Sequence, residues 1–322
     1  MTRDGGPRDV TRDGGPREVT RDGGPREVTR IAIVGPGRLG TLLATAASRA
    51  GYRVAAVAGG DAHAQARLTA RVAGTRAVDD PVDAAAMANL LVLTTPPDAL
   101  EPVVRNLVGA DALGDGHRMV HVAAGLGLEP LVLAARAGAR VAACHPAVVV
   151  PTGTTDPGHL VGVPWAVTAD ASERPWADEL VRDLGGDPHA IAADRRALYG
   201  AAVTLAGDAV AAATVAARQL LLAAAHDAPA DVVERLGATA TAPVRHGGAA
   251  ALADLSGPVV RGDVATLRAE LTAVADDLPA LSPAQRQALG LVLAMVRAGL
   301  DADVADHLDG LLAGGRSPGS AG

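Results

Sequence analysis

The sequence predicts an α/β protein, in which a Rossmann-type parallel sheet domain is followed by an all-α C-terminal domain. Short apolar runs alternate with helical segments from residue 30 to about residue 150, as in parallel strands covered by helices on both faces. A glycine-rich turn follows the first of these runs. From Arg174 onward the pattern is almost entirely helical.

The chain opens on a tandem repeat. A nine-residue unit that begins at Thr2 recurs at Thr11 and Thr20, and a fourth copy runs into Ile31. A unit of Gly-Gly-Pro with mixed charge cannot bury apolar surface, so it predicts a disordered tail. A functional tail is the alternative. The expected organisation is a repeat tail, a dinucleotide-binding Rossmann domain, a helical domain that contributes to a dimer and a substrate cleft, and a second disordered tail, at residues 1–29, 30–170, 171–313 and 314–322.

Continuous apolar runs predict buried strands, and segments rich in helix formers predict the helices. Gly51 follows the first helix at the position where a left-handed residue often ends a helix. The expected strands are residues 30–34, 53–58, 90–94, 119–122, 140–143 and 165–168. The expected helices are residues 38–50, 97–108, 128–137, 174–184, 194–225, 230–242, 263–275 and, in pieces, 283–312.

The glycine-rich turn is Gly35-Pro36-Gly37-Arg38-Leu39-Gly40, between the first strand and the first helix. In this context Gly35 allows a tight turn, Gly37 lets the backbone approach a pyrophosphate, and Gly40 lets the helix pack close to the strand. The helix N-terminus then faces the phosphates. The turn therefore predicts a nicotinamide dinucleotide site, and a purely structural turn is the alternative.

The end of the second strand bears on the choice of cofactor. NAD usually requires an acidic residue there, but the strand ends in Ala58-Gly59-Gly60, with Asp61 beyond it. Arg38 and Arg67 could take a 2′-phosphate. This favours NADP, and NAD stays open.

A second cofactor contact is expected after residues 90–94, at the carboxyl edge of the sheet. There we expect the backbone of Thr95 and Pro96 to line the nicotinamide ribose. The same segment also suits a helix start, with Asp98 in the first turn.

Composition excludes several classes of function. The net charge of −7 and an aromatic content of 1% argue against nucleic acid or an anionic membrane as partners. All 29 basic residues are Arg, so Schiff-base chemistry and a P-loop lysine are excluded. Residues 201–225 are interrupted by Asp208 and Arg218 and look too polar for a good membrane span. These features predict a soluble cytoplasmic protein.

With these motifs the chain resembles Rossmann-like oxidoreductases whose C-terminal half is the domain of unknown function 2520, relatives of pyrroline-5-carboxylate reductase and of the 6-phosphogluconate-dehydrogenase-like group. The resemblance covers roughly residues 30 to 275. It rests on the glycine turn, Thr95-Pro96-Pro97-Asp98, Val120-His121 with Gly125, Cys144-His145-Pro146, Leu198-Tyr199 and, most specifically, Leu255 to Asp263. It implies an NAD(P)-dependent oxidoreductase with a helical second domain that forms a homodimer. In one departure, Gly200 stands where the family often has a His after the Tyr.

The candidate proton donors for hydride transfer to a C=O or C=N bond are His121, His145 and Tyr199. Each histidine ends a predicted strand at the cofactor edge, where a histidine bonded only to backbone is the alternative. Tyr199 begins the long helix, and it either donates its hydroxyl to substrate or fills the domain interface. Cys144 and His145 are adjacent on a strand and point to opposite faces, which makes them a poor nucleophilic pair.

Arg261 and Asp263 could bind a carboxylate substrate, although Asp263 also suits the N-cap of the following helix. The spacing of the histidines indicates no metal site. The function expected is reduction of a small carbonyl or imine compound in the interdomain cleft. The alternative is a dinucleotide-binding sensor or scaffold protein without catalysis.

Overall fold

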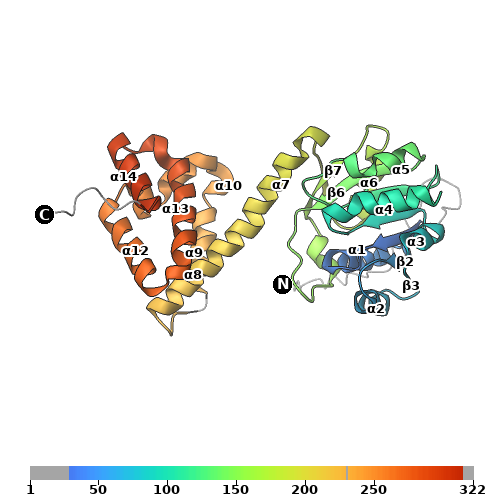
Figure 1. The fold of residues 1–322 in the computed structure, drawn as a ribbon, viewed down its shortest axis with the longest axis horizontal. Helices are drawn as coiled ribbons and strands as arrows, with labels where there is room; N and C mark the ends of the chain where they lie inside the picture. The colour runs from blue at the N-terminus through green and yellow to red at the C-terminus, as the bar shows by residue number, and fades with distance from the viewer. Residues whose placement is uncertain (1–28, 230, 315–322) are drawn as a thin grey trace, which may run out of the picture.

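The computed structural model of the protein describes residues 29–229 and 231–314. The predicted tails fall outside this range except for the residues at its two ends. Within it, a sheet part and a helical part are joined by one long helix (Figure 1).

The sheet has eight strands in the order β3-β2-β1-β4-β5-β6-β7-β8. The first six strands are parallel, β7 runs antiparallel to β6, and β8 runs parallel to β7. This is the doubly wound arrangement in which ligands bind at the carboxyl ends of the strands. The strands are β1 (Arg30–Val34), β2 (Arg53–Ala58), β3 (Arg76–Val78), β4 (Leu90–Leu93), β5 (Arg118–His121), β6 (Arg140–Pro146), β7 (Pro164–Thr168) and β8 (Asp187–Ala190).

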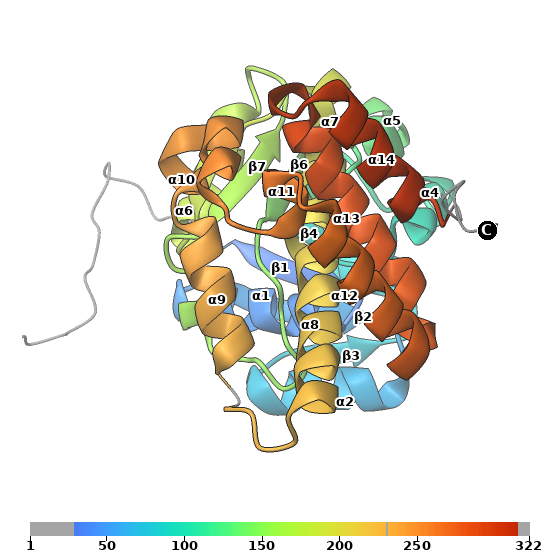
Figure 2. The ribbon, with the colours of Figure 1, turned by 90° about the vertical axis from the view of Figure 1, so that its left-hand side faces the viewer.

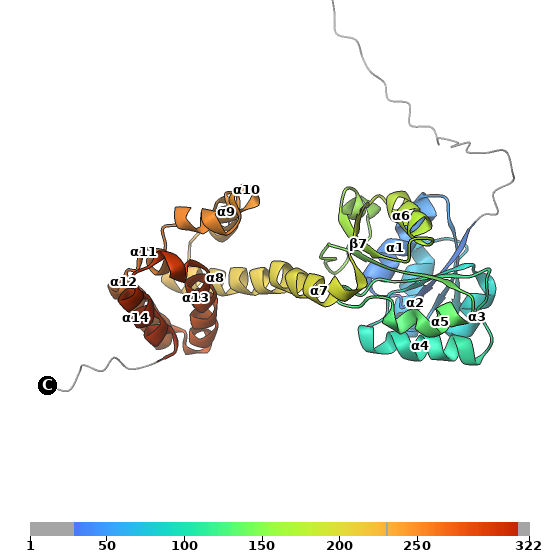
Figure 3. The same ribbon diagram turned by 90° about the horizontal axis from the view of Figure 1, so that it is seen from above.

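Helices cover both faces of the sheet (Figure 3). On one face, Leu42 and Leu43 of α1 and Val181 of α6 are buried against the strands. On the other, Leu100 of α4 and Leu131 beside α5 fill a second cluster. Each buried side chain of this size contributes about 1.5–3 kcal/mol. The helices of this part are α1 (Arg38–Arg49), α2 (Ala62–Arg71), α3 (Pro81–Met87), α4 (Pro97–Gly109), α5 (Val132–Arg136) and α6 (Arg174–Asp183).

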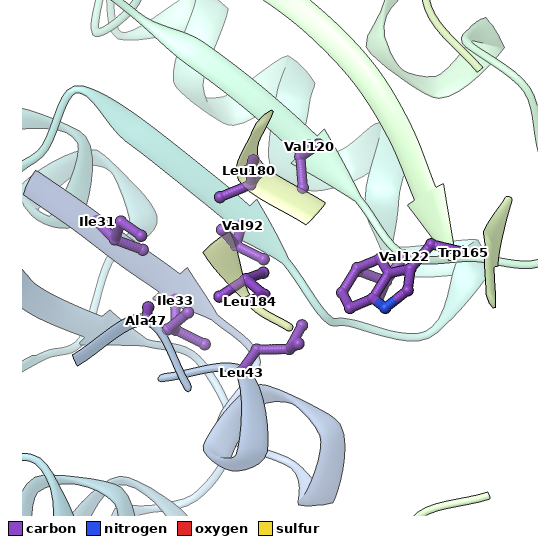
Figure 4. Close-up of a pocket in the computed structure, with 10 residues that line it drawn as sticks. All are labelled: Ile31, Ile33, Leu43, Ala47, Val92, Val120, Val122, Trp165, Leu180 and Leu184. Carbon is purple, nitrogen blue, oxygen red and sulfur yellow. The ribbon is translucent and has the colours of Figure 1, made fainter. Parts of the chain in front are cut away.

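A small apolar cavity of about 10 Å³ lies between the sheet, α1 and α6. Figure 4 shows Leu43 and Ala47 of α1 facing Leu180 and Leu184 of α6 across it, with Trp165 at one side. A space of this size holds at most one water, and its apolar lining offers that water no partners. The cavity is therefore a packing gap.

The helical part begins with α7 (Arg196–Thr204), which passes through a π-helical turn at Leu205–Ala209 into α8 (Val210–Ala224). The remaining helices pack beside α8 (Figure 2). Their own core contains Leu267, Leu271, Leu293 and Leu308. They are α9 (Val232–Thr241), α10 (Val244–Gly247), α11 (Pro258–Arg261), α12 (Val264–Asp277), α13 (Ser282–Val296) and α14 (Ala302–Leu312).

The sheet domain extends further along the chain than the sequence predicts. Beyond the boundary expected at residue 170, β8 still pairs with β7, and α6 packs into the sheet core. The helical part begins near residue 193 instead.

The long helix also corrects an expectation about polarity. Residues Ala193–Ala224 are long and apolar enough to cross a membrane by length and composition, and no residue in the most apolar window of this helix is fully buried. The expectation that residues 201–225 are too polar for a span is therefore wrong on composition. One such helix is weak evidence for a membrane span, since helices of soluble proteins pass the same test.

Candidate functional site

Gly35 makes the turn between β1 and α1 that the sequence predicts. Its φ of 106° lies in the region that favours glycine, and its N–H donates to the Ala58 carbonyl at 2.9 Å. A Cβ at Gly35 would lie 2.9 Å from the backbone carbon of Thr94 and the nitrogen of Thr95. Both the conformation and the space therefore require glycine.

Gly40 lets α1 approach this turn. A Cβ there would lie 2.2 Å from the Gly35 oxygen and 2.6 Å from Thr94 Oγ1. The Thr94 hydroxyl donates to the Gly35 carbonyl at 2.5 Å and so holds the turn to the end of β4. The sequence places Thr94 at a strand end, but nothing in it indicates this contact, which crosses 59 residues.

Gly37 differs from the other two glycines because its missing side chain leaves open space. Its φ is −69°, and a Cβ would meet nothing within 4 Å. It is the N-cap of the 12-residue α1, with no side-chain cap and no acidic residue in the first turn. A free helix N-terminus beside open space suits a phosphate group. The turn fits the pyrophosphate of a dinucleotide.

The acidic residue just beyond the end of β2 has a structural contact. Asp61 is the N-cap of α2, and its side chain accepts the N–H of Ala64 at 2.6 Å. Arg38 and Arg67 are exposed nearby in the chain. Pro36 lies against Gly60, where a Cβ would come within 2.9 Å of its ring, so the glycine turn adjoins this strand end.

Thr95 and Pro96 lie between β4 and α4. Pro96 is the N-cap of α4, and Asp98 lies in its first turn, so the helix-start alternative is confirmed. The hydroxyl of Thr95 is buried, and it has no hydrogen-bond partner among the described residues. A buried donor of this kind usually has a partner, so the hydroxyl is available to a ligand at this edge.

The structure brings together two of the three predicted proton donors. The Nδ1 atom of His145, near the end of β6, lies 2.9 Å from the hydroxyl of Tyr199 in α7. The ring centroids are 5.6 Å apart at an interplanar angle of 75°. Both residues are half-buried. A partly exposed histidine–phenol pair at a strand end can pass a proton to a ligand.

Burial sets the protonation of this pair. Burial, together with the positive charge of Arg196, lowers the pKa of His145 to about 4. Burial raises the pKa of Tyr199, and the charge of Arg196 opposes that rise. At neutral pH the imidazole is uncharged and the phenol keeps its proton.

His121 is the third predicted donor, and its contacts are to the following loop. Its side chain is fully buried, its Nδ1 accepts the N–H of Ala123 at 3.1 Å, and its Nε2 lies 2.6 Å from the Gly127 carbonyl. Because Nδ1 accepts, Nε2 carries the proton and donates to that carbonyl. Burial lowers the pKa of His121 to about 4. These contacts favour the structural alternative for His121.

Cys144 and His145 do point apart. Cys144 is buried in the sheet core, where burial raises the pKa of its thiol to about 12. His145 turns to the other face and contacts Tyr199. The two cannot form a nucleophile–base pair.

Gly200, where the resemblance leads us to expect a His, packs against backbone. A Cβ at Gly200 would lie 2.7 Å from the Cα atom of Gly125 in the loop after β5. A histidine would not fit there without moving α7. Glycine at this position therefore allows α7 and the loop after β5 to approach closely.

Arg261 and Asp263 lie in the helical part, at α11 and the start of α12 (Figure 2). Asp263 caps α12 as predicted, accepting the N–H of Thr266 at 3.0 Å and its hydroxyl at 2.7 Å. These bonds lower the pKa of Asp263. Arg261 donates to the Ser256 carbonyl and lies 3.8 Å from Asp263. The contacts support the structural alternative for both residues.

Arg196, the first residue of α7, is a further member of the site. It is 1% exposed, and it lies in the same cluster as Tyr199 and His145. No sequence signal separates it from the other arginines. Among the described residues, no group of three or more His, Cys, Asp or Glu side chains is arranged to hold a metal ion.

Comparison with protein-family models finds two domains. A Rossmann-like domain matches residues 19–146, and a domain of unknown function, DUF2520, matches residues 163–288. No curated protein matches the chain.

Solved structures share the fold. A candidate NADP oxidoreductase from Bacteroides fragilis superposes with a TM-score of 0.69 at 18% identity, covering 82% of this chain and 97% of its own. An imine reductase from Streptomyces aurantiacus gives 0.63 at 19% identity, with coverages of 88% and 99%. A reductive aminase from Aspergillus terreus, solved with NADPH and ethyl levulinate, gives 0.59 at 18% identity and the same two coverages.

Proposed function

Because the chain joins a Rossmann-like domain to a DUF2520 domain, we propose that it is an NAD(P)-dependent oxidoreductase that reduces a small carbonyl or imine compound. One observation carries the proposal. The His145–Tyr199 pair lies at the carboxyl ends of the strands, the same edge that presents the open glycine turn. A proton donor and a dinucleotide cradle at one sheet edge are the two requirements of such a reduction.

The glycine turn, Thr95 and His145 follow one another along the carboxyl edge of the sheet in the order of their strands. The glycine turn follows β1, Thr95 follows β4, and His145 lies two strands beyond β4 on β6. Neighbouring strands are about 4.8 Å apart, so β6 lies about 10 Å from β4. A dinucleotide with its pyrophosphate at Gly37 and its adenosine toward β2 would direct its other end toward Thr95. The substrate would then lie between that end and Tyr199.

In the proposed reaction a bound reduced nicotinamide supplies the hydride. Tyr199 donates its hydroxyl proton to the oxygen or nitrogen of the substrate. His145 returns a proton from Nδ1 to the phenol oxygen, and its Nε2 takes one from solvent. The imidazole changes tautomer and stays uncharged, as its lowered pKa favours. No lysine is needed.

We propose NADP as the preferred cofactor. Asp61, just beyond the end of β2, already uses one carboxylate oxygen to cap the N-terminus of α2, which makes it a weaker candidate for ribose hydroxyls. Arg38, the first residue of α1, and Arg67, in α2, are exposed. A 2′-phosphate would gain from either charge. The NADPH bound to the Aspergillus terreus enzyme agrees with this preference.

The experiment is a binding titration with NADPH, NADH and their oxidised forms on wild type and Gly37→Val. The added side chain enters open space, so the variant should fold and lose binding by at least about tenfold. Gly116→Val is the matched control, because its site is also open and lies at the opposite edge of the sheet. Wild type that binds none of the four cofactors, or a Gly37→Val that binds like wild type, contradicts the proposal. Binding without turnover of any carbonyl or imine substrate would favour the sensor or scaffold alternative.

We also propose that two copies associate through the helical part. The window of the long helix that could span a membrane has no fully buried residue in the single chain. Leu198 and Leu205 are seven residues apart, as are Val215 and Leu222, so each pair lies on one side of the helix. Exposed apolar residues at such spacing are typical of an interface.

A further inference from the structure

Arg196 is a buried cation held by uncharged acceptors. Its Nε donates to Thr168 Oγ1 at 2.7 Å, and its Nη1 donates to the Ala124 carbonyl at 3.3 Å. Its Nη2 donates to the carbonyls of Ala143 and Ala166, at 2.5 and 3.0 Å. All four acceptors are neutral. A buried charge that is held only by neutral acceptors, as this one is in the described part of the chain, is costly, so its retention calls for a reason.

The acceptors come from three separate segments. Ala143 belongs to β6, Ala166 and Thr168 belong to β7, and Ala124 lies in the loop after β5. The planar guanidinium thus joins the first residue of α7 to two strands and a loop. Tyr199 stands three residues further along α7, almost one turn. The position of its hydroxyl against His145 therefore depends on this anchor.

The charge also lies beside the pair. The Arg196 guanidinium carbon is 5.8 Å from the centroid of the Tyr199 ring. One of its acceptors, Ala143, is two residues before His145 in β6. A cation here disfavours a second positive charge on the imidazole and favours negative charge on the phenol oxygen.

We propose that Arg196 is a positioning residue of the reaction site, which fixes the His145–Tyr199 pair and uses its buried charge to keep that pair a neutral proton relay. The proposal rests on the proposed function for the identity of the reaction. A charge in a site of low dielectric acts more strongly than in water, and it needs no reorganisation when the proton moves. That advantage offsets the cost of burying the guanidinium.

Other titratable groups face the relay as well. His121 acts on His145 from β5, and its own low pKa leaves it uncharged at neutral pH. Cys144 adjoins from β6 with its thiol protonated. Glu129, in the turn before α5, acts on Arg196 and His121. Arg196 is therefore the cation whose removal should change the titration of His145 most.

The experiment follows the ring protons of His145 by NMR as pH is varied, assigned by comparison with His145→Gln. Arg196→Met removes the charge at similar length, and Arg196→Lys keeps the charge without the planar fork. We expect the pKa of His145 to rise by roughly one unit in Arg196→Met and to change little in Arg196→Lys. Thr168→Val is the matched control, because it removes one hydrogen bond and keeps the charge; its His145 should titrate as in wild type.

An unchanged pKa of His145 in a folded Arg196→Met overturns the proposal, and so does an equal shift in Thr168→Val. If Arg196→Met does not fold, wild type decides, because a His145 that titrates at 6.5 or above shows no influence of the guanidinium. The titration requires neither cofactor nor turnover. Failure of the proposed function would instead appear as absent dinucleotide binding, so the two failures are distinguishable.

With an active enzyme, Arg196→Lys should lower kcat about tenfold or more and leave the cofactor Kd unchanged, because lysine cannot make the four hydrogen bonds that fix the position of Tyr199.

Discussion

At the scale of single residues, the histidines at the ends of β5 and β6 differ in what their ring nitrogens contact. Both nitrogens of His121 are bonded to the backbone of its own loop, at Ala123 and Gly127. His145 uses one nitrogen on the hydroxyl of Tyr199. A proton relay needs a ring nitrogen that contacts a group able to give up and accept a proton. Of these two histidines, His145 has such a contact, with the Tyr199 hydroxyl, whereas His121 contacts only backbone.

Tyr199→Phe tests the chemical role of that hydroxyl. The change removes one oxygen from a half-buried ring and should leave the fold and NADPH binding intact. We expect kcat for reduction of a carbonyl or imine substrate to fall about 100-fold or more, because the proton donor is lost. Tyr52→Phe is the control; its hydroxyl bonds Asp183 at 2.6 Å, outside the relay. Equal activity in wild type and Tyr199→Phe would assign the tyrosine to the interface instead.

The same histidines predict how stability depends on pH. Each has a folded pKa near 4 against 6.5 for the free side chain, so the unfolded chain binds more protons between these values. The stabilisation is complete above pH 6.5 and is lost as pH falls toward 4. We expect the free energy of unfolding to drop on the order of 2–5 kcal/mol across this window. Urea unfolding at several pH values measures it.

His63→Gln, a change at an exposed histidine, should leave that profile unaltered. The pKa values of the carboxylates of Asp156, Glu173 and Asp263 are lowered, so these groups stay charged over most of this window and contribute little to the profile. Stability that is constant, or that increases, between pH 6.5 and 4 would mean that neither histidine is held neutral.

At the scale of elements, the contact between the N-terminal part of α7 and the loop after β5 sets the direction of the long helix. Gly200 and Gly125 bring helix and loop backbones together with no room for a Cβ at Gly200. Arg196 fastens the same turn to β6 and β7. The long helix therefore leaves the sheet in a direction set by its first two turns.

Gly200→Ala tests this contact against a matched change in the same helix. The new Cβ would meet Gly125 at 2.7 Å, and the overpacking should lower the free energy of unfolding by about 1–3 kcal/mol. Gly207→Ala, in the π-helical turn, meets nothing within 4 Å and should be neutral or stabilising by up to about 1 kcal/mol. Urea unfolding of both variants compares them. Equal stability of the two would show that helix and loop can separate without loss.

Much of the sheet could be predicted because buried parallel strands are continuous apolar runs. The first strand is such a run, and its position is confirmed. The glycine turn that follows it is also confirmed. β3 and β8 lack such a run: β8 is Asp187-Pro188-His189-Ala190 and largely exposed at the sheet edge. The sequence therefore gives no period by which to detect it.

The site was predictable in its parts and not in its pairing. Residue type and position at strand or helix ends pointed to His145 and Tyr199, but 54 residues separate them, and no periodicity reports a contact at that distance. Arg196 was missed because every basic residue here is arginine. Burial, which only the fold creates, is what distinguishes it.

At the scale of the whole molecule, two packed parts are joined by one long helix (Figures 1 and 3). The sheet part and the helical part each have a core of their own. The joining helix exposes apolar side chains on its surface, which favours a partner for it.

Association can be tested by light scattering after gel filtration. Val215→Glu combined with Leu222→Glu places charges on one side of α8, and we expect it to convert a dimer into a monomer, because burying a carboxylate without a partner is costly. The control is Val132→Glu with Val161→Glu, a similar pair of changes at exposed apolar residues of the sheet part. Wild type that is already monomeric, or a double variant that stays dimeric, contradicts association through α8.

The joining helix has a mechanical consequence as well. From Arg196 to Ala224 it rises about 1.5 Å per residue, which makes an arm of about 40 Å. A tilt of roughly 5° at its root would swing the far end by about 4 Å. The contact between Gly200 and Gly125 and the hydrogen bonds of Arg196 both lie at the N-terminal end of this helix. A small rotation at this contact therefore produces a much larger displacement at the Ala224 end of the helix.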